Sequence, residues 1–314
     1  MRKNKLLIGF FLALLGLIIV EYYIYTNYSK LTRETIKISF VVSDDNLDRW
    51  DNMQYGAEAA ASDNDCIVTF VNSPRDAGPE GELDVISRQF SEGADYVAVA
   101  SGYYGKVREL VKAKSFASSV IFVKTGNVKS DHNNLMVDEY SLGRDLAQHI
   151  IDAKESYNLL LLGGSESANA NLAIDGLKDA LDKSDIEYEL ALSKDSAELV
   201  NNVYQLRYAL RYDGVVALDS ATIDMIASKK DYLLDAISVY AIDNRQESVY
   251  YLDSSLVDAL AYEDDYSLGY ITVEHFLDGK SLTRIAKGVP LYYIVDKESM
   301  YSEQMEKVLF PFVK

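Results

Sequence analysis

Short, continuously apolar runs alternate with longer amphipathic segments along most of the chain. Runs rich in β-branched and apolar residues, bounded by polar turns, are typical of strands. Because these runs are continuous and do not alternate with polar residues, we expect both strand faces to be buried, as in a parallel sheet. The strands predicted in the first half are 36–42, 67–71, 96–100, 120–123 and a weaker 135–137.

Helical spacing of apolar residues separates these strands. The first-half helices are expected over 50–61, around 83–90 and over 107–113. After a helix at 141–153, the same order begins again. The second half has predicted strands at 159–162, 188–192, 214–218, 237–242 and 257–261, with helices at 170–181, 197–210, 223–226 and 267–277. The chain therefore contains two similar β/α halves, and the lack of a Pro/Gly/Ser-rich linker indicates closely coupled lobes.

The first 30 residues differ from all the others. Residues 6–20 are uninterruptedly apolar, and three basic residues but no acidic ones precede them. Extended to Tyr25, the segment would form about 30 Å of helix, enough to cross a bilayer. We predict a basic cytoplasmic start and one transmembrane anchor within 1–30, which places the bulk of the chain outside the cell membrane. A cleaved signal peptide and a buried core helix are the alternatives, although residues 20–29 have no A-x-A-like cleavage site.

Composition narrows the class of protein. The chain has 314 residues, 48% of them hydrophobic, and a formal net charge of −18 at pH 7. This excludes a disulfide-stapled miniprotein and a disordered acidic tail, because enough apolar material is present to fill a core. The acidity, with no basic cluster beyond the membrane-proximal one, disfavours nucleic acid as a partner.

Motifs for catalysis and metal binding are weak. The segment 163–167 approaches a G-x-S-x-G nucleophile elbow but has Ser167 in place of the last glycine. The 3 histidines lack the spacing of a catalytic triad. The acidic segments 63–65 and 263–265 lack the Gly and Glu of a calcium loop. We therefore expect a protein that is not an enzyme and that carries neither a cofactor nor a metal.

Several short motifs follow one another in a characteristic order. They are Ile38-Ser-Phe-Val-Val-Ser43, Trp50, Tyr55-Gly-Ala57, Asp138-Glu-Tyr-Ser-Leu-Gly143, Gly163-Gly-Ser165, Asp175-Gly-Leu177, Asp219, Ala241-Ile-Asp243 and Tyr266-Ser-Leu-Gly269. In this order they resemble the type I periplasmic sugar-binding proteins, the ribose-binding and lac-repressor-core group, over residues 36 to about 297. The resemblance implies an α/β fold with two doubly wound parallel-sheet lobes. The lobes would close over a small polar ligand without catalysing a reaction.

The resemblance also implies three crossings of the chain between the lobes. They are expected near Val137–Glu139, Tyr262–Asp264 and Gly288–Leu291. The N-terminal lobe would then comprise 36–138 plus 264–289, and the C-terminal lobe 139–263 plus 290–314. The last long helix would belong to the first lobe, and the tail, with an amphipathic helix, to the second.

The ligand site is expected where the carboxyl ends of the strands leave a crevice and helix amino ends supply donors. A sugar has apolar C–H faces and a girdle of hydroxyls, which suits an aromatic ring with polar groups at its edges. The resemblance makes Trp50 the stacking residue and Asp243 a carboxylate on the hydroxyls; packing at a helix start and helix capping are the respective alternatives. Further candidates are Asp219, which could equally cap the next helix, and Asn171, Asn46, Tyr103, Tyr104 and Glu263.

The chain departs from the family pattern at the expected site. Where such sugar binders often have arginines, after the fourth strand and at the start of the second-lobe helix, this sequence has Lys124-Thr125 and Asn171. It also has Glu263 at the hinge-side polar position. A cationic ligand, such as a polyamine or an amino sugar, is therefore an alternative to a neutral sugar. Six acidic residues near the expected cleft favour it: Asp44, Asp45, Asp48, Asp219, Asp243 and Glu263.

The sequence thus predicts a membrane-anchored extracytoplasmic solute-binding protein for a sugar or similar small polar ligand. Its closed form would be presented to an ABC permease or to a sensor histidine kinase. The alternative from another class is a ligandless scaffold or adhesion module on the cell surface, derived from the same fold.

Overall fold

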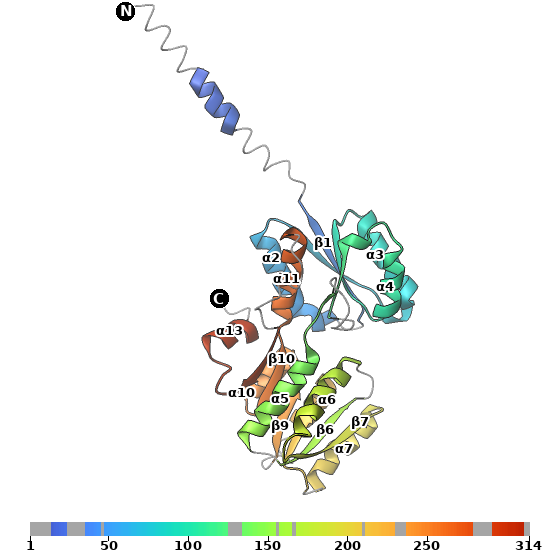
Figure 1. Ribbon diagram of the computed structural model, residues 1–314, viewed down its shortest axis with the longest axis vertical. Coiled ribbons are helices and arrows are strands. Elements are labelled where there is room, and N and C mark those ends of the chain that lie inside the picture. The colour runs from blue at the N-terminus through green and yellow to red at the C-terminus, as the bar shows by residue number, and fades with distance from the viewer. Residues whose placement is uncertain are drawn as a thin grey trace, which may run out of the picture.

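The chain folds into two α/β lobes, one above the other in Figure 1. The computed structural model describes residues 14–23, 35–44, 47–124, 134–154, 157–164, 168–208, 211–229, 237–278 and 291–310. Within these residues the strands form two separate sheets, each flanked by helices. The predicted α/β class with parallel sheets is confirmed.

The first sheet is parallel throughout, in the order β2-β1-β3-β4-β5. Its central strands are buried on both faces, as the continuous apolar runs predict, whereas the edge strand β2 is partly exposed along its length. Phe40 of β1 stacks on Phe70 of β2 with ring centroids 4.5 Å apart. The bounds are β1 (Lys37–Val42), β2 (Ile67–Asn72), β3 (Tyr96–Ala100), β4 (Val120–Val123) and β5 (Asn134–Leu135).

Helices from two distant parts of the sequence cover this sheet. They are α2 (Asp51–Asp63), α3 (Gly78–Ser91), α4 (Tyr104–Lys112) and α11 (Asp265–Asp278), with short 3-10 turns η1 (Leu47–Trp50), η2 (Arg75–Ala77) and η3 (Ala117–Ser119). Helix α11 lies beside α2 in the upper lobe (Figure 1). Two glycines allow this approach: a Cβ on Gly56 would lie 1.9 Å from the carbonyl oxygen of Tyr266, and one on Gly269 would lie 2.1 Å from that of Met53.

The second sheet has the order β11-β10-β9-β8-β6-β7, parallel except that β11 runs antiparallel to β10. Its strands are β6 (Asn158–Gly164), β7 (Glu187–Ser193), β8 (Gly214–Ala217), β9 (Ser238–Ile242), β10 (Ala259–Glu263) and β11 (Tyr292–Asp296). The helices around it are α5 (Glu139–Ala153), α6 (Ala168–Leu181), α7 (Ser196–Tyr208), α8 (Ser220–Ala227), α10 (Gln246–Asp253) and α13 (Glu303–Leu309).

The chain passes between the sheets within the described residues twice. After β5 in the first sheet, α5 packs with α6 and with strands of the second sheet. After β10 in the second sheet, the chain returns as α11 beside α2, and β11 then pairs with β10. The third passage, expected near Gly288–Leu291, lies outside the described residues except for Leu291. The exact lobe boundaries given above stay predictions.

Several elements differ from the sequence-based expectation. The tail begins with strand β11 before its helix α13, because residues 292–296 pair with the free edge of β10. Helix α10 was not predicted; it is short and places Ser248, Val249 and Leu252 inward. Strand β10 begins at Ala259, two residues later than expected, where its pairing with β9 starts.

The expected transmembrane helix is not supported within the described residues. No helix there is long and apolar enough to cross a bilayer. A helix covers residues 14–23, which is part of the apolar segment, and the rest of that segment lies outside the described residues. The anchor therefore stays a prediction.

Candidate functional site

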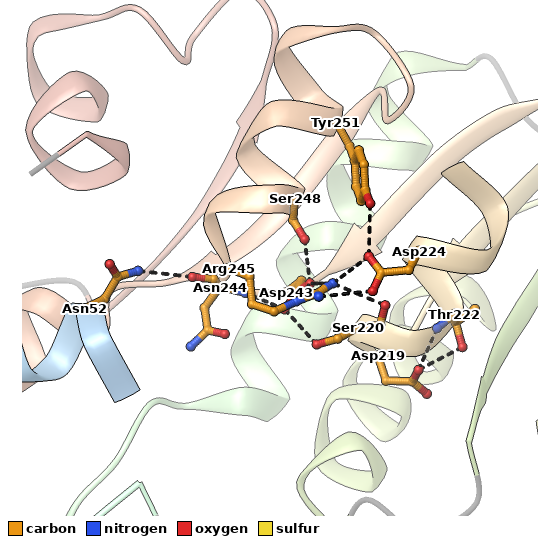
Figure 2. Close-up of polar contacts among 10 residues, drawn as sticks. All are labelled: Asn52, Asp219, Ser220, Thr222, Asp224, Asp243, Asn244, Arg245, Ser248 and Tyr251. Carbon is orange, nitrogen blue, oxygen red and sulfur yellow. Dashed lines mark hydrogen bonds and ion pairs between the residues drawn. The ribbon is translucent and has the colours of Figure 1, made fainter. Parts of the chain in front are cut away.

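The two lobes meet at the ends of their strands, where polar side chains from both make direct contacts. Asn52, near the start of α2, donates from Nδ2 to the carbonyl oxygen of Asn244 at 3.3 Å (Figure 2). The same amide donates to the hydroxyl of Tyr262 at 3.1 Å. Asn244 follows β9 and Tyr262 lies in β10, so one buried side chain of the first lobe contacts two neighbouring strand regions of the second.

Asp243 lies at the carboxyl end of β9 and is 7% exposed. One carboxylate oxygen accepts from the Ser220 hydroxyl at 3.0 Å and from the Asn244 backbone N–H at 2.9 Å. The other accepts from Arg245 Nε at 2.8 Å and from the Ser248 hydroxyl. Figure 2 shows these groups converging on the carboxylate. Its own chain therefore already supplies donors to both oxygens, so Asp243 fixes the loop after β9 and the start of α10.

Arg245 joins this loop to a second carboxylate. Its guanidinium also contacts Asp224 of α8 at 2.9 Å, and Tyr251 donates to the same aspartate at 3.2 Å. Burial alone would lower the pKa of Arg245, but its hydrogen bonds with Asp224 and Asp243 raise it. The arginine is thus a permanent cation held between two acids.

Asp219 is the N-cap of α8. Its Oδ1 accepts from the backbone N–H and the hydroxyl of Thr222, both at 2.9 Å, and its Oδ2 accepts from the Gly164 N–H at 2.5 Å. An N-cap satisfies a donor that the helix leaves without an internal partner. The capping alternative for Asp219 is therefore present in the structure, and its contact with a ligand stays a prediction.

Trp50 ends η1 and is the N-cap residue of α2. Its ring is partly buried against the core, and its indole Nε1 donates to Asp44 Oδ2 at 3.3 Å. Asp44 follows β1, is 6% exposed and lies 3.6 Å from Arg49 and 3.9 Å from Arg75. The indole is thus held at the strand edge where the sequence predicts the cleft.

Lys124 follows β4 and is the centre of an ion cluster. Its ammonium lies 2.7 and 2.6 Å from the two oxygens of Asp265 and 3.0 Å from Glu263. Asn244 also donates to Asp265, which links the loop after β9 to the start of α11. Glu263 ends β10, so the Lys124 ammonium connects the first sheet to the second.

Burial shifts the acid-base properties of this cluster. Desolvation would lower the pKa of Lys124, but attraction by Asp265 and Glu263 raises it above its ordinary value. Desolvation raises the pKa of Asp265 to about 6 although Lys124 opposes this. The pKa of Glu139, at the start of α5, is raised to about 8, mainly by burial and also by repulsion from Glu263. Attraction by Lys124 opposes this rise.

The remaining candidate ligand contacts are spread over both lobes. The Tyr103 hydroxyl donates to the carbonyl oxygen of Arg75 at 2.6 Å on the first lobe. The Tyr104 ring packs edge-on against Phe122 at 5.1 Å and belongs to that lobe's core. Asn171 lies in α6, but its side chain is outside what is described, as is Asn46 altogether.

Sequence reasoning missed four residues that join the lobes, namely Asn52, Lys124 as an ion-pair centre, Asn244 and Asp265. It also missed Arg245, which fixes the loop after β9, and the buried Glu139. One signal in the sequence could have found two of them. Lys124 and Asp265 each follow the carboxyl end of a predicted strand, where the lobes of such a fold meet. The pairing itself depends on the relative placement of two sheets, which the local pattern does not contain.

A cavity of about 470 Å³ lies beside this junction, between the start of α11, β11 and α13. Its lining residues are Asp264, Tyr266, Ser267, Tyr293, Glu303, Gln304, Lys307 and Val308. Neither Trp50 nor Asp243 belongs to it.

Comparison with known sequences and structures identifies the family. Residues 38–278 match the family described as periplasmic binding protein domain. The chain belongs to this family. No curated protein sequence matches it significantly. The resemblance to periplasmic binding proteins inferred from the motif order is confirmed.

Solved structures share the fold of this family member. A glucose-galactose binding protein from Geobacillus stearothermophilus has a TM-score of 0.66 at 16% identity, over 86% of this chain and 100% of its own. An ABC transporter solute-binding protein from Burkholderia graminis, in complex with D-arabinose, has a TM-score of 0.67 at 16% identity, over 85% and 97%. A XylFII–LytSN complex matches with a TM-score of 0.61 at 16% identity, over 84% and 98%. These likenesses show that the chain has the fold of sugar-binding proteins of ABC transporters.

Proposed function

We propose that this periplasmic binding protein domain is an extracytoplasmic receptor that closes its two lobes over a neutral sugar or a similar polyol, and that it is not an enzyme. The observation that carries the proposal is the convergence of polar groups from both lobes at the strand ends, with Asn52 of one lobe bonded to Asn244 of the other. The Burkholderia graminis relative with D-arabinose supports the ligand class.

Charge balance favours a neutral ligand over a cationic one. Asp243 is paired with Arg245, and Asp44 faces two arginines. Glu263 and Asp265 share Lys124. Because each of these carboxylates already contacts a cation of its own chain, an ammonium ligand would compete with that cation for it. A sugar needs only acceptors, donors and an aromatic face.

In this proposal Trp50 supplies the ring that stacks on the sugar. Asp243 and Arg245, fixed by their neighbours, offer a rigid polar edge, since preorganised groups lose little entropy on binding. The other predicted contacts keep their proposed roles: Asp219, Glu263, Asn171, Asn46, Tyr103 and Tyr104.

The closed form would be read by a membrane protein that binds it more tightly than the open form. An ABC permease and a sensor histidine kinase both fit this role, and the family fold occurs in an ABC transporter solute-binding protein and in a XylFII–LytSN complex. The apolar segment 6–25 would tether the receptor, with its bulk extracytoplasmic.

A ligandless scaffold or adhesion module is the second candidate. The observation that favours it is the saturation of Asp219 and Asp243 by donors of their own chain. If Asp219 or Asp243 binds a ligand directly, the ligand must replace some of these hydrogen bonds. A scaffold without a ligand keeps all of them.

Thermal-shift measurements on the full chain distinguish the two. Pentoses, hexoses, inositols and polyamines are added singly, and the receptor proposal expects one sugar or polyol to raise the midpoint by several degrees, because a ligand that binds only the folded state stabilises it. A rise of the unfolding midpoint with polyamines alone would show that the ligand is a cation and not a sugar. No shift across the panel would favour the scaffold.

A further inference from the structure

Asn244 bonds the second lobe to the first at the edge of the predicted ligand site. It is the residue after Asp243, in the loop between β9 and α10. Its backbone N–H donates to Asp243 Oδ1 at 2.9 Å, so it helps to orient this carboxylate. Its carbonyl oxygen accepts from Asn52 Nδ2 at 3.3 Å (Figure 2), and its side-chain amide donates to Asp265. One residue thus contacts a predicted ligand carboxylate and two side chains that lie outside its loop.

The two partners of Asn244 outside its loop are fixed to the first lobe. Asn52 is buried near the start of α2, and α2 packs on β2 of the first sheet. Asp265 begins α11, which lies against α2. The Lys124 ammonium, at the end of β4, lies 2.7 and 2.6 Å from the two carboxylate oxygens of Asp265. Because Asn244 itself follows a strand of the second sheet, both hydrogen bonds cross from one lobe to the other.

Separation of the lobes breaks these crossing bonds and spares the bond within the loop. A rigid-body rotation that opens the lobes carries α2 and the end of β4 away from the loop after β9. The bonds of Asn244 to Asn52 and to Asp265 are then lost. The Asn244 N–H moves together with Asp243 and keeps its bond to this carboxylate. Asn244 therefore holds Asp243 against the first lobe only while the lobes are together.

We propose that Asn244 is a positioning residue that couples the ligand site to lobe closure: its bonds to Asn52 and Asp265 favour the closed form and present Asp243 to the sugar. The inference rests on the proposed function, because it names the residue through which closure acts on that site. Coupling of this kind is reciprocal. Bonds that favour the closed form raise the affinity for a ligand that selects this form, and a bound sugar stabilises the same bonds.

The first test measures the distance between the lobes without ligand. Spin labels are attached to Lys112→Cys on α4 and Asn201→Cys on α7, both exposed positions, in a Cys66→Ser background of the full chain. The label on α4 reports the first lobe and the label on α7 the second, so opening lengthens the mean distance between them.

Asn244→Ala keeps the backbone bonds of this residue and removes the side-chain bond to Asp265. Loss of a hydrogen bond to a charged group should lower the ratio of closed to open molecules about tenfold or more. Gln246→Ala is the matched control. It removes an amide bond of 3.1 Å to the carbonyl oxygen of Leu309, which lies in the core of the second lobe, and should leave the distance unchanged.

An exchange of two side chains separates positioning from a general loosening of the fold. Asn244→Asp sets a second carboxylate against Asp265 and should open the lobes further than Asn244→Ala does, because neighbouring like charges repel. Asn244→Asp combined with Asp265→Asn has the same two side chains and the same net charge as the unchanged chain, with donor and acceptor exchanged. This double variant should return the mean distance toward the shorter value.

Sugar binding supplies the second readout. Titration with D-arabinose, other pentoses, hexoses and inositols should show weaker binding to Asn244→Ala, by at most the factor found for the ratio of closed to open molecules, and unchanged binding to Gln246→Ala. Distances that change in neither Asn244 variant overturn the inference, and so does an equal change in Gln246→Ala. Sugar binding with unchanged distances contradicts only the role of Asn244, whereas opening of the Asn244 variants without binding of any sugar contradicts the receptor proposal.

Discussion

The ammonium of Lys124, at the end of β4 in the first sheet, lies 3.0 Å from the carboxylate of Glu263, at the end of β10 in the second. This is one of the few charged contacts that join the two lobes directly in the described part of the chain. Because Lys124 also balances Asp265, the stability of the junction depends on one cation.

Replacing Lys124 with methionine should therefore destabilise the chain strongly near neutral pH. Breaking a buried ion pair by removing one partner leaves its acids uncompensated and costs about 3–5 kcal/mol. Urea unfolding gives the change in the free energy of unfolding, with Lys112→Met on the exposed surface of α4 as control. A loss smaller than about 1 kcal/mol would show that the cluster is hydrated and that its charges are screened.

Glu139→Gln should change how stability depends on pH. The folded-state pKa of Glu139 is raised to about 8 from the ordinary 4.5, so the stability from its protonated form is full below pH 4.5 and is lost as pH rises through about 8. The amide has no proton to lose. Near pH 8 the variant should be more stable than the unchanged chain by about 2–4 kcal/mol, and near pH 4 the difference should vanish. Parallel curves for the two proteins would contradict the raised pKa.

The packing of α11 on α2 predicts the effect of Gly56→Ala. The new methyl group would lie 1.9 Å from the carbonyl oxygen of Tyr266, so the helices must separate, at a cost of about 1–3 kcal/mol or more. Gly105→Ala in α4 is the matched control, because nothing lies within 4 Å of its Cβ position. That control should stabilise the protein by up to about 1 kcal/mol through helix propensity. Equal effects of the two variants, measured by thermal unfolding, would exclude close contact between α2 and α11.

Asn52→Ala should shift the lobes toward the open form. The change removes the hydrogen bonds to the carbonyl oxygen of Asn244 and to the Tyr262 hydroxyl, each contributing about 1 kcal/mol. Spin labels on Lys112→Cys in α4 and Asn201→Cys in α7, both exposed positions, in a Cys66→Ser background of the full chain, should report a longer mean distance between the lobes. Gln54→Ala on the same helix as Asn52 should leave this distance unchanged. An unaltered distribution in Asn52→Ala would mean that other contacts hold the lobes together.

Much of the fold could be predicted because the strands carry their own signal. Runs such as Leu159–Leu162 are apolar, continuous and bounded by polar turns, so local pattern and tertiary burial agree. Strand β11 was not predicted, because five residues do not decide between strand and helix, and only pairing with the free edge of β10 selects the strand. Short α10 has too few turns for a clear period.

The predicted ligand contacts stay predictions, and the sequence does not contain the bonds that the candidate side chains make with their own chain. Asp243 directly follows β9, and Trp50 lies at the start of α2. The sequence does not show that Asp243 is bonded to Arg245 or that Asp219 caps α8. A carboxylate after a strand suits a ligand and a helix cap equally well. Choosing between these roles needs the positions of the neighbouring donors.

The most direct test of the central claim, closure of two lobes over a sugar, is the distance between the labels on α4 and α7 during titration with D-arabinose, other pentoses, hexoses and inositols. The account predicts that one of these ligands narrows the distribution toward the shorter distance in a saturable manner and that Trp50→Ala weakens the response. A distribution unchanged by every member of the panel would contradict it.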